Sequence, residues 1–173
     1  MTGVITETGR AVRIEPGLSR QAHGSVIIHC GQTIVQCAAS IQAGVPKFIQ
    51  DQSQGWLTAE YSMLPSATHS RTQRESMRGK VSGRTNEIQR MIGRTLRASI
   101  NLKALGAYTV MIDCDVLNAD GGTRTAAITG GFVAMLKALQ YAQYKKMIKK
   151  DPLQFFMAAT SVPQASFIEL ENS

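Results

Sequence analysis

Residues 120–126 form the feature that most constrains the fold of this chain. They read Asp-Gly-Gly-Thr-Arg-Thr-Ala, and they connect a run of β-branched and apolar residues to a long alanine-rich run. Two consecutive glycines allow positive φ angles, and the first turn of a helix adds unpaired N–H groups and a partial positive charge. Arg124 supplies a planar cation between two threonine hydroxyls. The segment therefore predicts a strand–turn–helix unit that cradles phosphate, with a plain turn as the alternative.

The length and composition fit a single globular domain. The chain has 173 residues, of which 43% are hydrophobic, so it can bury a sizeable core. It contains no apolar run of the roughly 20 residues that a membrane span needs, and its N-terminus does not resemble a secretory signal. Cys30, Cys37 and Cys114 are isolated and odd in number, which favours reduced, buried thiols over a disulfide or metal site. We therefore expect one cytoplasmic domain over residues 1–173, without membrane contact.

The positive charge is concentrated in one segment. Between Arg71 and Lys103 nine basic residues stand against two acidic ones, which accounts for the whole net charge of +7. The remainder of the chain is balanced. Such a local asymmetry is typical of a polyanion-binding surface, and it favours nucleic acid as the partner over a merely solvated helix face.

Periodicity and turn residues predict an α+β fold. Strands are expected over residues 11–15, 24–30, 33–40, 56–63, 108–117, 155–162 and 167–170. The Gly31-Gln32 dipeptide predicts a hairpin between the second and third of them. Helices are expected over residues 85–101 and 123–147, and loops over residues 45–55 and 66–83.

The first predicted helix has two distinct faces. Its apolar positions recur at helical spacing and predict a buried face made of Ile88, Met91, Ile92 and Leu96. Its basic positions form a stripe on another face, made of Arg90, Arg94 and Arg97. Gly83-Arg84-Thr85 opens this helix with an arginine beside a hydroxyl, so two arginine-bearing helix starts could converge on one anion. The spacing alone does not establish that they meet.

Asp113 and Asp115 lie on the same face of the predicted strand that leads into the glycine turn. Two carboxylates in this arrangement could share a divalent ion. They could equally form ion pairs with arginines of the basic helix. Because no third ligand stands at a convincing spacing, we favour pairing with arginine and predict no metal site.

Three segments carry a resemblance to a known family. Residues 55–65 read GWLTAEYSMLP, residues 82–94 read SGRTNEIQRMIGR, and residues 112–130 read IDCDVLNADGGTRTAAITG. In order and spacing they resemble ribonuclease PH. The likeness extends from about Arg10 to Leu170, which is nearly all of this chain but only roughly the first two-thirds of a family member.

The resemblance implies a phosphate-dependent 3′→5′ exoribonuclease that trims tRNA precursors. Inorganic phosphate is then the co-substrate, nucleoside diphosphates are the products, and Mg²⁺ is a possible cofactor. The implied fold is the α+β fold of ribosomal protein S5 domain 2, and the implied assembly is a homo-oligomeric ring of six subunits arranged as dimers. The residues matching the family's phosphate site are Arg84, Gly122, Thr123 and Arg124. Those matching its RNA-binding positions are Arg71 and Arg74.

Three departures from the family pattern affect the predicted activity. Ser66 replaces an arginine, and Asp51 stands in a loop that is basic in the family. The acidic segment that supplies the family's catalytic carboxylates is expected beyond Ser173, the last residue of this sequence, and Glu169 and Glu171 belong to the preceding strand. The catalytic residues are therefore unassigned. A non-catalytic RNA-binding or ring-forming subunit, and a truncated remnant of the enzyme, remain alternatives to the active enzyme.

Overall fold

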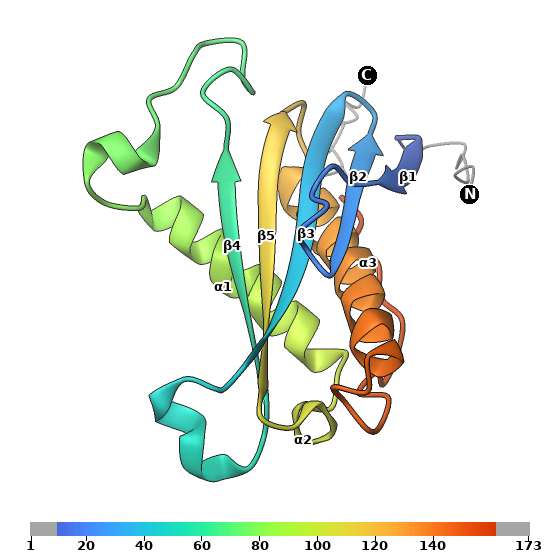
Figure 1. The fold of residues 1–173 in the computed structure, drawn as a ribbon. Coiled ribbons are helices and arrows are strands. Elements are labelled where there is room, and N and C mark those ends of the chain that lie inside the picture. The colour runs from blue at the N-terminus through green and yellow to red at the C-terminus, as the bar shows by residue number, and fades with distance from the viewer. Residues whose placement is uncertain (1–9, 162–173) are drawn as a thin grey trace, which may run out of the picture.

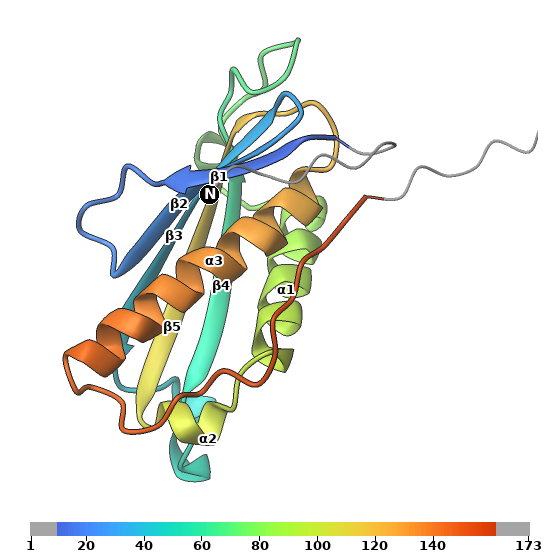
Figure 2. The same cartoon turned by 90° about the vertical axis from the view of Figure 1, so that its right-hand side faces the viewer.

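The computed structural model describes residues 10–161, apart from the side chains of Ser76 and Arg78. It forms a five-stranded sheet with two long helices packed on one face (Figures 1 and 2). The strands are β1 (Val12–Pro16), β2 (Gly24–Cys30), β3 (Thr33–Ala43), β4 (Trp56–Met63) and β5 (Tyr108–Asn118). The α-helices are α1 (Gly83–Ala98), α2 (Leu102–Leu105) and α3 (Thr123–Tyr144), and short 3-10 helices span Lys47–Gln52 and Glu75–Arg78. The prediction of an α+β fold is confirmed.

The sheet is mixed, with the strand order β1-β2-β3-β5-β4. Only the β4–β5 pair is parallel among these neighbours, because α1 and α2 carry the chain back between the two strands. The predicted hairpin is confirmed: Cys30 pairs with Thr33 around a turn in which Gly31 has a φ of 60°. The parallel unit places the carboxyl ends of β4 and β5 at one edge, and α1 and α3 both begin near that edge (Figure 1).

The core lies between the sheet and the helices. Alternate residues of the central strands are buried, as in Val35 and Cys37 of β3 and Ile112 and Cys114 of β5. The predicted buried face of α1 is confirmed for Ile88, Ile92 and Leu96, whereas Met91 is partly buried. Cys37 and Cys114 are buried free thiols, and Cys30 is a half-buried free thiol.

Helix α3 crosses the sheet and is buried along most of its length (Figure 2). It ends at Tyr144, three residues earlier than predicted, and Lys145 caps it. Gly130 permits close contact with the sheet, since a Cβ there would stand 2.7 Å from both the Cys37 Sγ and the Ile28 Cγ2. Within residues 10–161 none of the helices combines the length and apolar character that would be needed to cross a membrane.

The segment after α3 differs from the prediction. Residues 155–161 do not form the expected strand but run in extended form along the helices (Figure 2). This segment is held by Thr129, whose hydroxyl accepts from the Ala159 N–H at 3.0 Å, and by the ring of Phe132 against Phe156. Its hydrogen bonds are therefore made to a helix side chain rather than to a neighbouring strand.

The last predictions made along the chain fall outside the described residues. They concern the strand expected over residues 167–170, the carboxylates of Glu169 and Glu171, and the end of the sequence at Ser173. The resemblance places the family's catalytic carboxylates beyond Ser173, and the described residues do not test that placement. The catalytic residues therefore stay unassigned.

Candidate anion-binding site

The glycine turn leads directly into an open helix start. Gly121 and Gly122 have φ angles of 75° and 66°, a region that favours glycine because it lacks a Cβ. Helix α3 begins at Thr123 without a side-chain cap, and its first backbone bond runs from the Ala126 N–H to the Gly122 carbonyl at 3.0 Å. The preceding N–H groups of the first turn therefore have no partner within the helix, and they lie at the positive end of its dipole.

Thr123 is connected to β4 through a buried side-chain hydrogen bond. The Tyr61 hydroxyl donates to the Thr123 Oγ1 at 2.9 Å, and the two residues are only 4% and 8% exposed. Burial raises the pKa of the Tyr61 phenol above 10, while the Thr123 bond and the positive charges of Arg84 and Arg124 oppose that rise. The positive charges of both arginines therefore act on one hydroxyl. The starts of α1 and α3 lie at the same end of the sheet, near Tyr61 (Figure 1).

The start of α1 is fixed by its own cap. The Ser82 Oγ accepts from the Thr85 N–H at 3.1 Å, and the Thr85 hydroxyl donates to the Glu75 carboxylate at 2.6 Å. These bonds join the first turn of α1 to the 3-10 helix Glu75–Arg78. Arg84 itself is exposed, so its guanidinium is available for an anion at this edge.

Two residues that sequence reasoning missed support the glycine turn from the other side. The Thr33 hydroxyl donates to the Gly121 carbonyl at 2.6 Å and accepts from the Asp120 N–H at 2.9 Å. Arg10 donates to the carbonyls of Asp120 and Gly121, the second at 3.0 Å. In the sequence, Thr33 is noticeable only as a polar residue that interrupts the apolar alternation directly after a hairpin turn. That pattern does not indicate that its hydrogen-bond partner is Gly121, almost ninety positions away.

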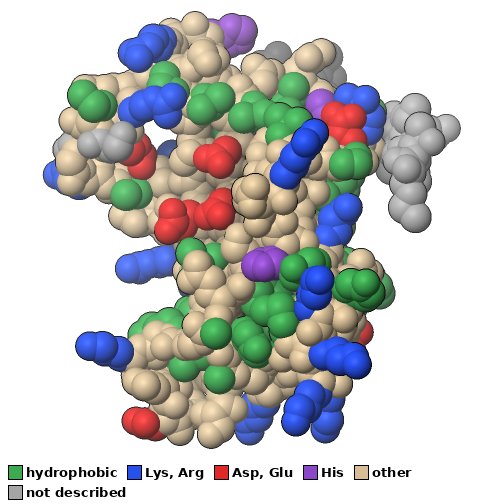
Figure 3. Space-filling model, viewed as in Figure 1, with side chains coloured by type: hydrophobic (Ala, Val, Ile, Leu, Met, Phe, Trp, Pro, Cys, Tyr) green, Lys and Arg blue, Asp and Glu red, His purple; other side chains and the backbone are tan. Residues whose placement is uncertain are grey.

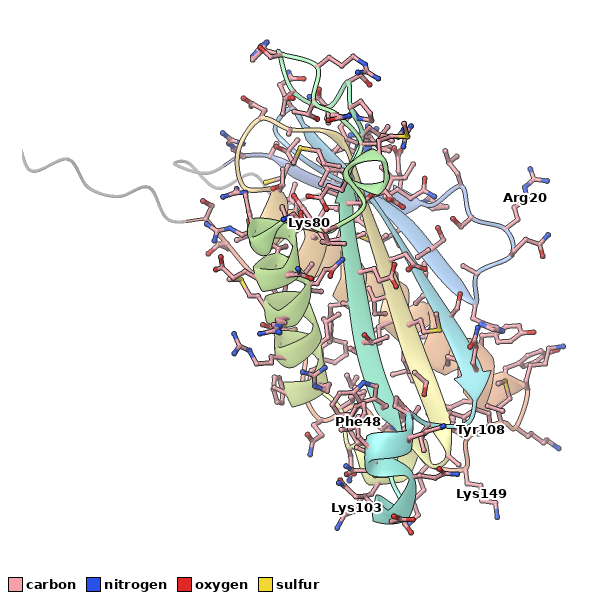
Figure 4. The ribbon with its side chains drawn as sticks, turned by 90° about the vertical axis from the view of Figure 1, so that its left-hand side faces the viewer. Arg20, Phe48, Lys80, Lys103, Tyr108 and Lys149 are labelled. Atoms are coloured by element: carbon pink, nitrogen blue, oxygen red, sulfur yellow. The ribbon has the colours of Figure 1, made fainter. Side chains whose placement is uncertain are left out.

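The loop that carries Arg71 and Arg74 stands at the same edge of the sheet. Both side chains are exposed in it. The Ala119 N–H donates to the Ala67 carbonyl at 2.8 Å, which fastens the base of the loop to the end of β5 (Figure 1). Figure 4 shows Lys80 beside the start of α1, whereas Phe48 and Lys103 lie at the opposite end of the molecule. The structure thus brings the predicted RNA-binding loop to the edge that holds the predicted phosphate site.

The carboxylates of β5 do not pair with arginine among the described residues, so the favoured interpretation was wrong. Asp113 and Asp115 instead face a cavity of about 550 Å³ beside Glu60, and acidic side chains gather in a hollow of this face (Figure 3). Burial, followed by the charges of Glu60 and Asp115, raises the pKa of Asp113. The Asp115 carboxylate accepts from Ser62 at 2.7 Å.

The described residues do not by themselves fit a Mg²⁺ site. Over residues 10–161, no three His, Cys, Asp or Glu side chains are grouped so that they could hold a metal ion. We therefore derive no metal-dependent step from them.

The basic stripe predicted on α1 is interrupted. Arg90 and Arg94 are exposed, but the Arg97 guanidinium stacks on Trp56 at 4.6 Å and donates to the Leu57 carbonyl at 2.8 Å. Burial and the charge of Arg94 lower the pKa of Arg97. Arg97 is therefore held against the start of β4, and only part of the stripe faces solvent.

Comparison with known proteins identifies relatives of this chain. A family model described as 3′ exoribonuclease family, domain 1, matches residues 8–139. Rice (Oryza sativa) Rrp46 is similar with a TM-score of 0.63 and 20% identity, over 79% of this chain and 59% of that one. A chain from the Archaeoglobus fulgidus exosome with RNA bound to the active site has a TM-score of 0.67 and 21% identity, over 84% and 58%. An archaeal exosome core chain has a TM-score of 0.56 and 20% identity, over 75% and 49%.

These values define how far the likeness extends. The chain spans less than two-thirds of the length of each of these three chains. At about 20% identity, the structural likeness establishes a shared fold.

Proposed function

This chain belongs to the 3′ exoribonuclease family, and from that premise we propose that it acts in phosphorolysis of RNA 3′ ends, including the trailing nucleotides of tRNA precursors. The observation that supports this proposal is that Arg84 and Arg124, from two separate helix starts, both act electrostatically on the Tyr61 hydroxyl that is bonded to Thr123. Two cations from separate helix starts, together with the open N-terminus of α3, suit a small, doubly charged anion such as inorganic phosphate.

The proposed site overcomes the repulsion between two anions. In phosphorolysis an oxygen of inorganic phosphate attacks the phosphorus of the terminal phosphodiester. The bond to the 3′ oxygen of the preceding nucleotide breaks, that oxygen takes a proton, and a nucleoside diphosphate leaves. Arg84, Arg124 and the N–H groups at Gly122 and Thr123 would hold the attacking phosphate in position and offset its charge.

Arg71 and Arg74 would hold the RNA strand at the same edge. Their exposed guanidinium groups suit phosphate oxygens of the chain, which fix the position of the strand without reading its sequence. Such contacts release counterions and make binding sensitive to salt.

A second candidate is a non-catalytic RNA-binding subunit of a ring. Two of the similar structures are archaeal exosome chains, one of them from an exosome with RNA bound to the active site, and this likeness supports a subunit that binds RNA within an assembly. In this case the cradle would bind a phosphate group of the RNA rather than free phosphate.

A phosphorolysis assay separates the two candidates. The protein is incubated with a tRNA that carries a short 3′ extension, with and without inorganic phosphate, and the released nucleotides are identified. Nucleoside diphosphates that appear only with phosphate support the enzyme, and RNA binding without such release supports the ring subunit. Arg84→Ala and Arg124→Ala should abolish release. Lys149→Ala, which removes an exposed cation at the other end of the molecule, should not (Figure 4).

A further inference from the structure

We propose that Thr33 is a positioning residue that holds the glycine turn in its phosphate-binding conformation. This inference rests on the proposed phosphate site. Thr33 is the first residue of β3 and is fully buried, at 0% exposure. Its single hydroxyl donates to the Gly121 carbonyl at 2.6 Å and accepts from the Asp120 N–H at 2.9 Å. One side chain thus bonds both sides of the Asp120–Gly121 segment.

Arg10 strengthens the same attachment from the surface. Its guanidinium donates to the carbonyls of Asp120 and Gly121 and approaches the Asp120 carboxylate at 3.8 Å. The Asn118 side chain also donates to the Gln32 carbonyl at 2.6 Å. The β2–β3 hairpin turn and the glycine turn are therefore joined by several hydrogen bonds. Thr33 makes the bonds that are shielded from water.

The direction of these bonds determines where the turn's N–H groups point. In a trans peptide the N–H and C=O groups point in opposite directions. Because the carbonyls of Asp120 and Gly121 face Arg10 and Thr33, the N–H groups of Gly121 and Gly122 face away from them. Successive N–H groups in such a turn form an anion-binding concavity. Thr33 therefore acts on the phosphate through the backbone and does not touch it.

The two glycines make this attachment necessary. A glycine pair populates many backbone conformations, and both residues here are held at positive φ. If the turn were not held, phosphate binding would have to order it. The apparent affinity would then be the intrinsic affinity multiplied by the fraction of molecules in the binding conformation.

A matched pair of substitutions isolates the hydroxyl. Thr33→Val keeps the shape of the side chain and removes both hydrogen bonds, whereas Thr33→Ser keeps the hydroxyl and removes only a methyl group. Arg10→Gln removes the exposed part of the attachment and is expected to fold, since Arg10 lies at the surface. Amide hydrogen exchange of residues 120–126 and calorimetric titration with inorganic phosphate are measured for each variant.

We expect Thr33→Val to speed amide exchange in the turn at least tenfold and to weaken phosphate binding about tenfold. Thr33→Ser should restore both to within about twofold, and Arg10→Gln should show the same changes to a smaller degree. Unchanged exchange in Thr33→Val would overturn the inference. So would faster exchange with unchanged phosphate affinity. If Thr33→Val does not fold, equal phosphate affinity and equal exchange in Arg10→Gln and the wild type overturn it.

The two measurements also separate this inference from the function on which it rests. A wild-type protein that does not bind phosphate contradicts the proposed function, whatever the variants do. Exchange in the turn then still reports whether Thr33 holds the glycines.

Discussion

Tyr61 and Thr123 stand 62 positions apart in the sequence, yet their hydroxyls form a 2.9 Å hydrogen bond inside the protein. Tyr61 belongs to β4 and Thr123 begins α3, so the bond joins the edge strand of the sheet to the start of the longest helix. The positive charges of Arg84 and Arg124 both act on the Tyr61 hydroxyl, so this bond is electrostatically linked to the two cations of the proposed phosphate site. The stability of the fold and the geometry of the site therefore depend on the same pair.

Replacing Tyr61 with phenylalanine should lower both stability and phosphate affinity. The substitution leaves the buried Thr123 hydroxyl without its donor, which costs about 1–2 kcal/mol. For a chain of this size that loss corresponds to a decrease in Tm of about 2–8 °C. Differential scanning calorimetry measures this decrease, and titration with phosphate measures the affinity.

Tyr144→Phe is the matched control, because that ring is 80% exposed and its substitution should leave Tm unchanged. The raised pKa of Tyr61 adds a second readout. The folded protein holds this proton more tightly than the unfolded chain, so the related stability is complete below pH 10 and is lost as the pH rises further. Ionisation of Tyr61 at or below pH 10 in a spectrophotometric titration would contradict the burial of its hydroxyl.

Gly130→Ala should destabilise the fold even though alanine is the better helix former. Alanine gains about 1 kcal/mol of helix propensity over glycine. Its Cβ would, however, stand 2.7 Å from both the Cys37 Sγ and the Ile28 Cγ2 in the core. Overpacking of this kind typically costs about 1–3 kcal/mol, and two buried contacts place it at the upper end. We expect a net loss of about 1–2 kcal/mol in the free energy of unfolding, measured by urea denaturation.

Gly83→Ala provides the comparison, because a Cβ at the start of α1 would meet no atom within 4 Å. Its stability should match that of the wild type within about 0.5 kcal/mol. Equal stability of the two variants would show that α3 does not approach the sheet as closely as the structure indicates.

Features formed by residues close in sequence could be predicted, whereas contacts that depend on the pairing of distant strands could not. The β2–β3 hairpin and the glycine turn follow from residues that are close in sequence, and both are confirmed. The role of Thr33 could not be predicted, because its partners become neighbours only when β3 pairs with β5. Arg97 shows the same limit. Helical spacing predicted that it belongs to an exposed basic stripe, whereas its guanidinium stacks on Trp56 of the neighbouring strand β4. Asp113 and Asp115 of β5 were predicted to form ion pairs with arginine. The sequence did not show that β4 pairs with β5 and places Glu60 beside Asp113.

Asp113→Asn should stabilise the protein at neutral pH. The pKa of Asp113 is raised, first by burial and then by Glu60 and Asp115, so its ionised form is disfavoured in the folded state. The stability linked to this group is therefore complete below its unfolded pKa of 3.8 and is lost as the pH rises through the folded value. Asparagine cannot ionise, so the Asp113→Asn variant does not lose this stability as the pH rises. We expect an increase in Tm of about 1–3 °C at pH 7, which shrinks as the pH is lowered toward 4.

Asp51→Asn is the control for the charge change, because that side chain is exposed on a 3-10 helix. It should alter Tm by less than about 1 °C at either pH. An Asp113→Asn variant that is less stable than the wild type at pH 7 would show that the carboxylate has a favourable partner.

Replacing Arg71 and Arg74 together with alanine should weaken RNA binding without affecting phosphate binding. Both side chains are exposed in the loop fastened to β5, so their loss removes cations without disturbing the core. On a single-stranded RNA each lost phosphate contact should reduce the slope of log K against log salt by about 0.7. Filter binding at several salt concentrations measures the slope. Lys149→Ala removes a cation from the other end of the molecule and should leave it unchanged. A slope that is the same in the Arg71→Ala/Arg74→Ala variant and the wild type would exclude this loop from the RNA path.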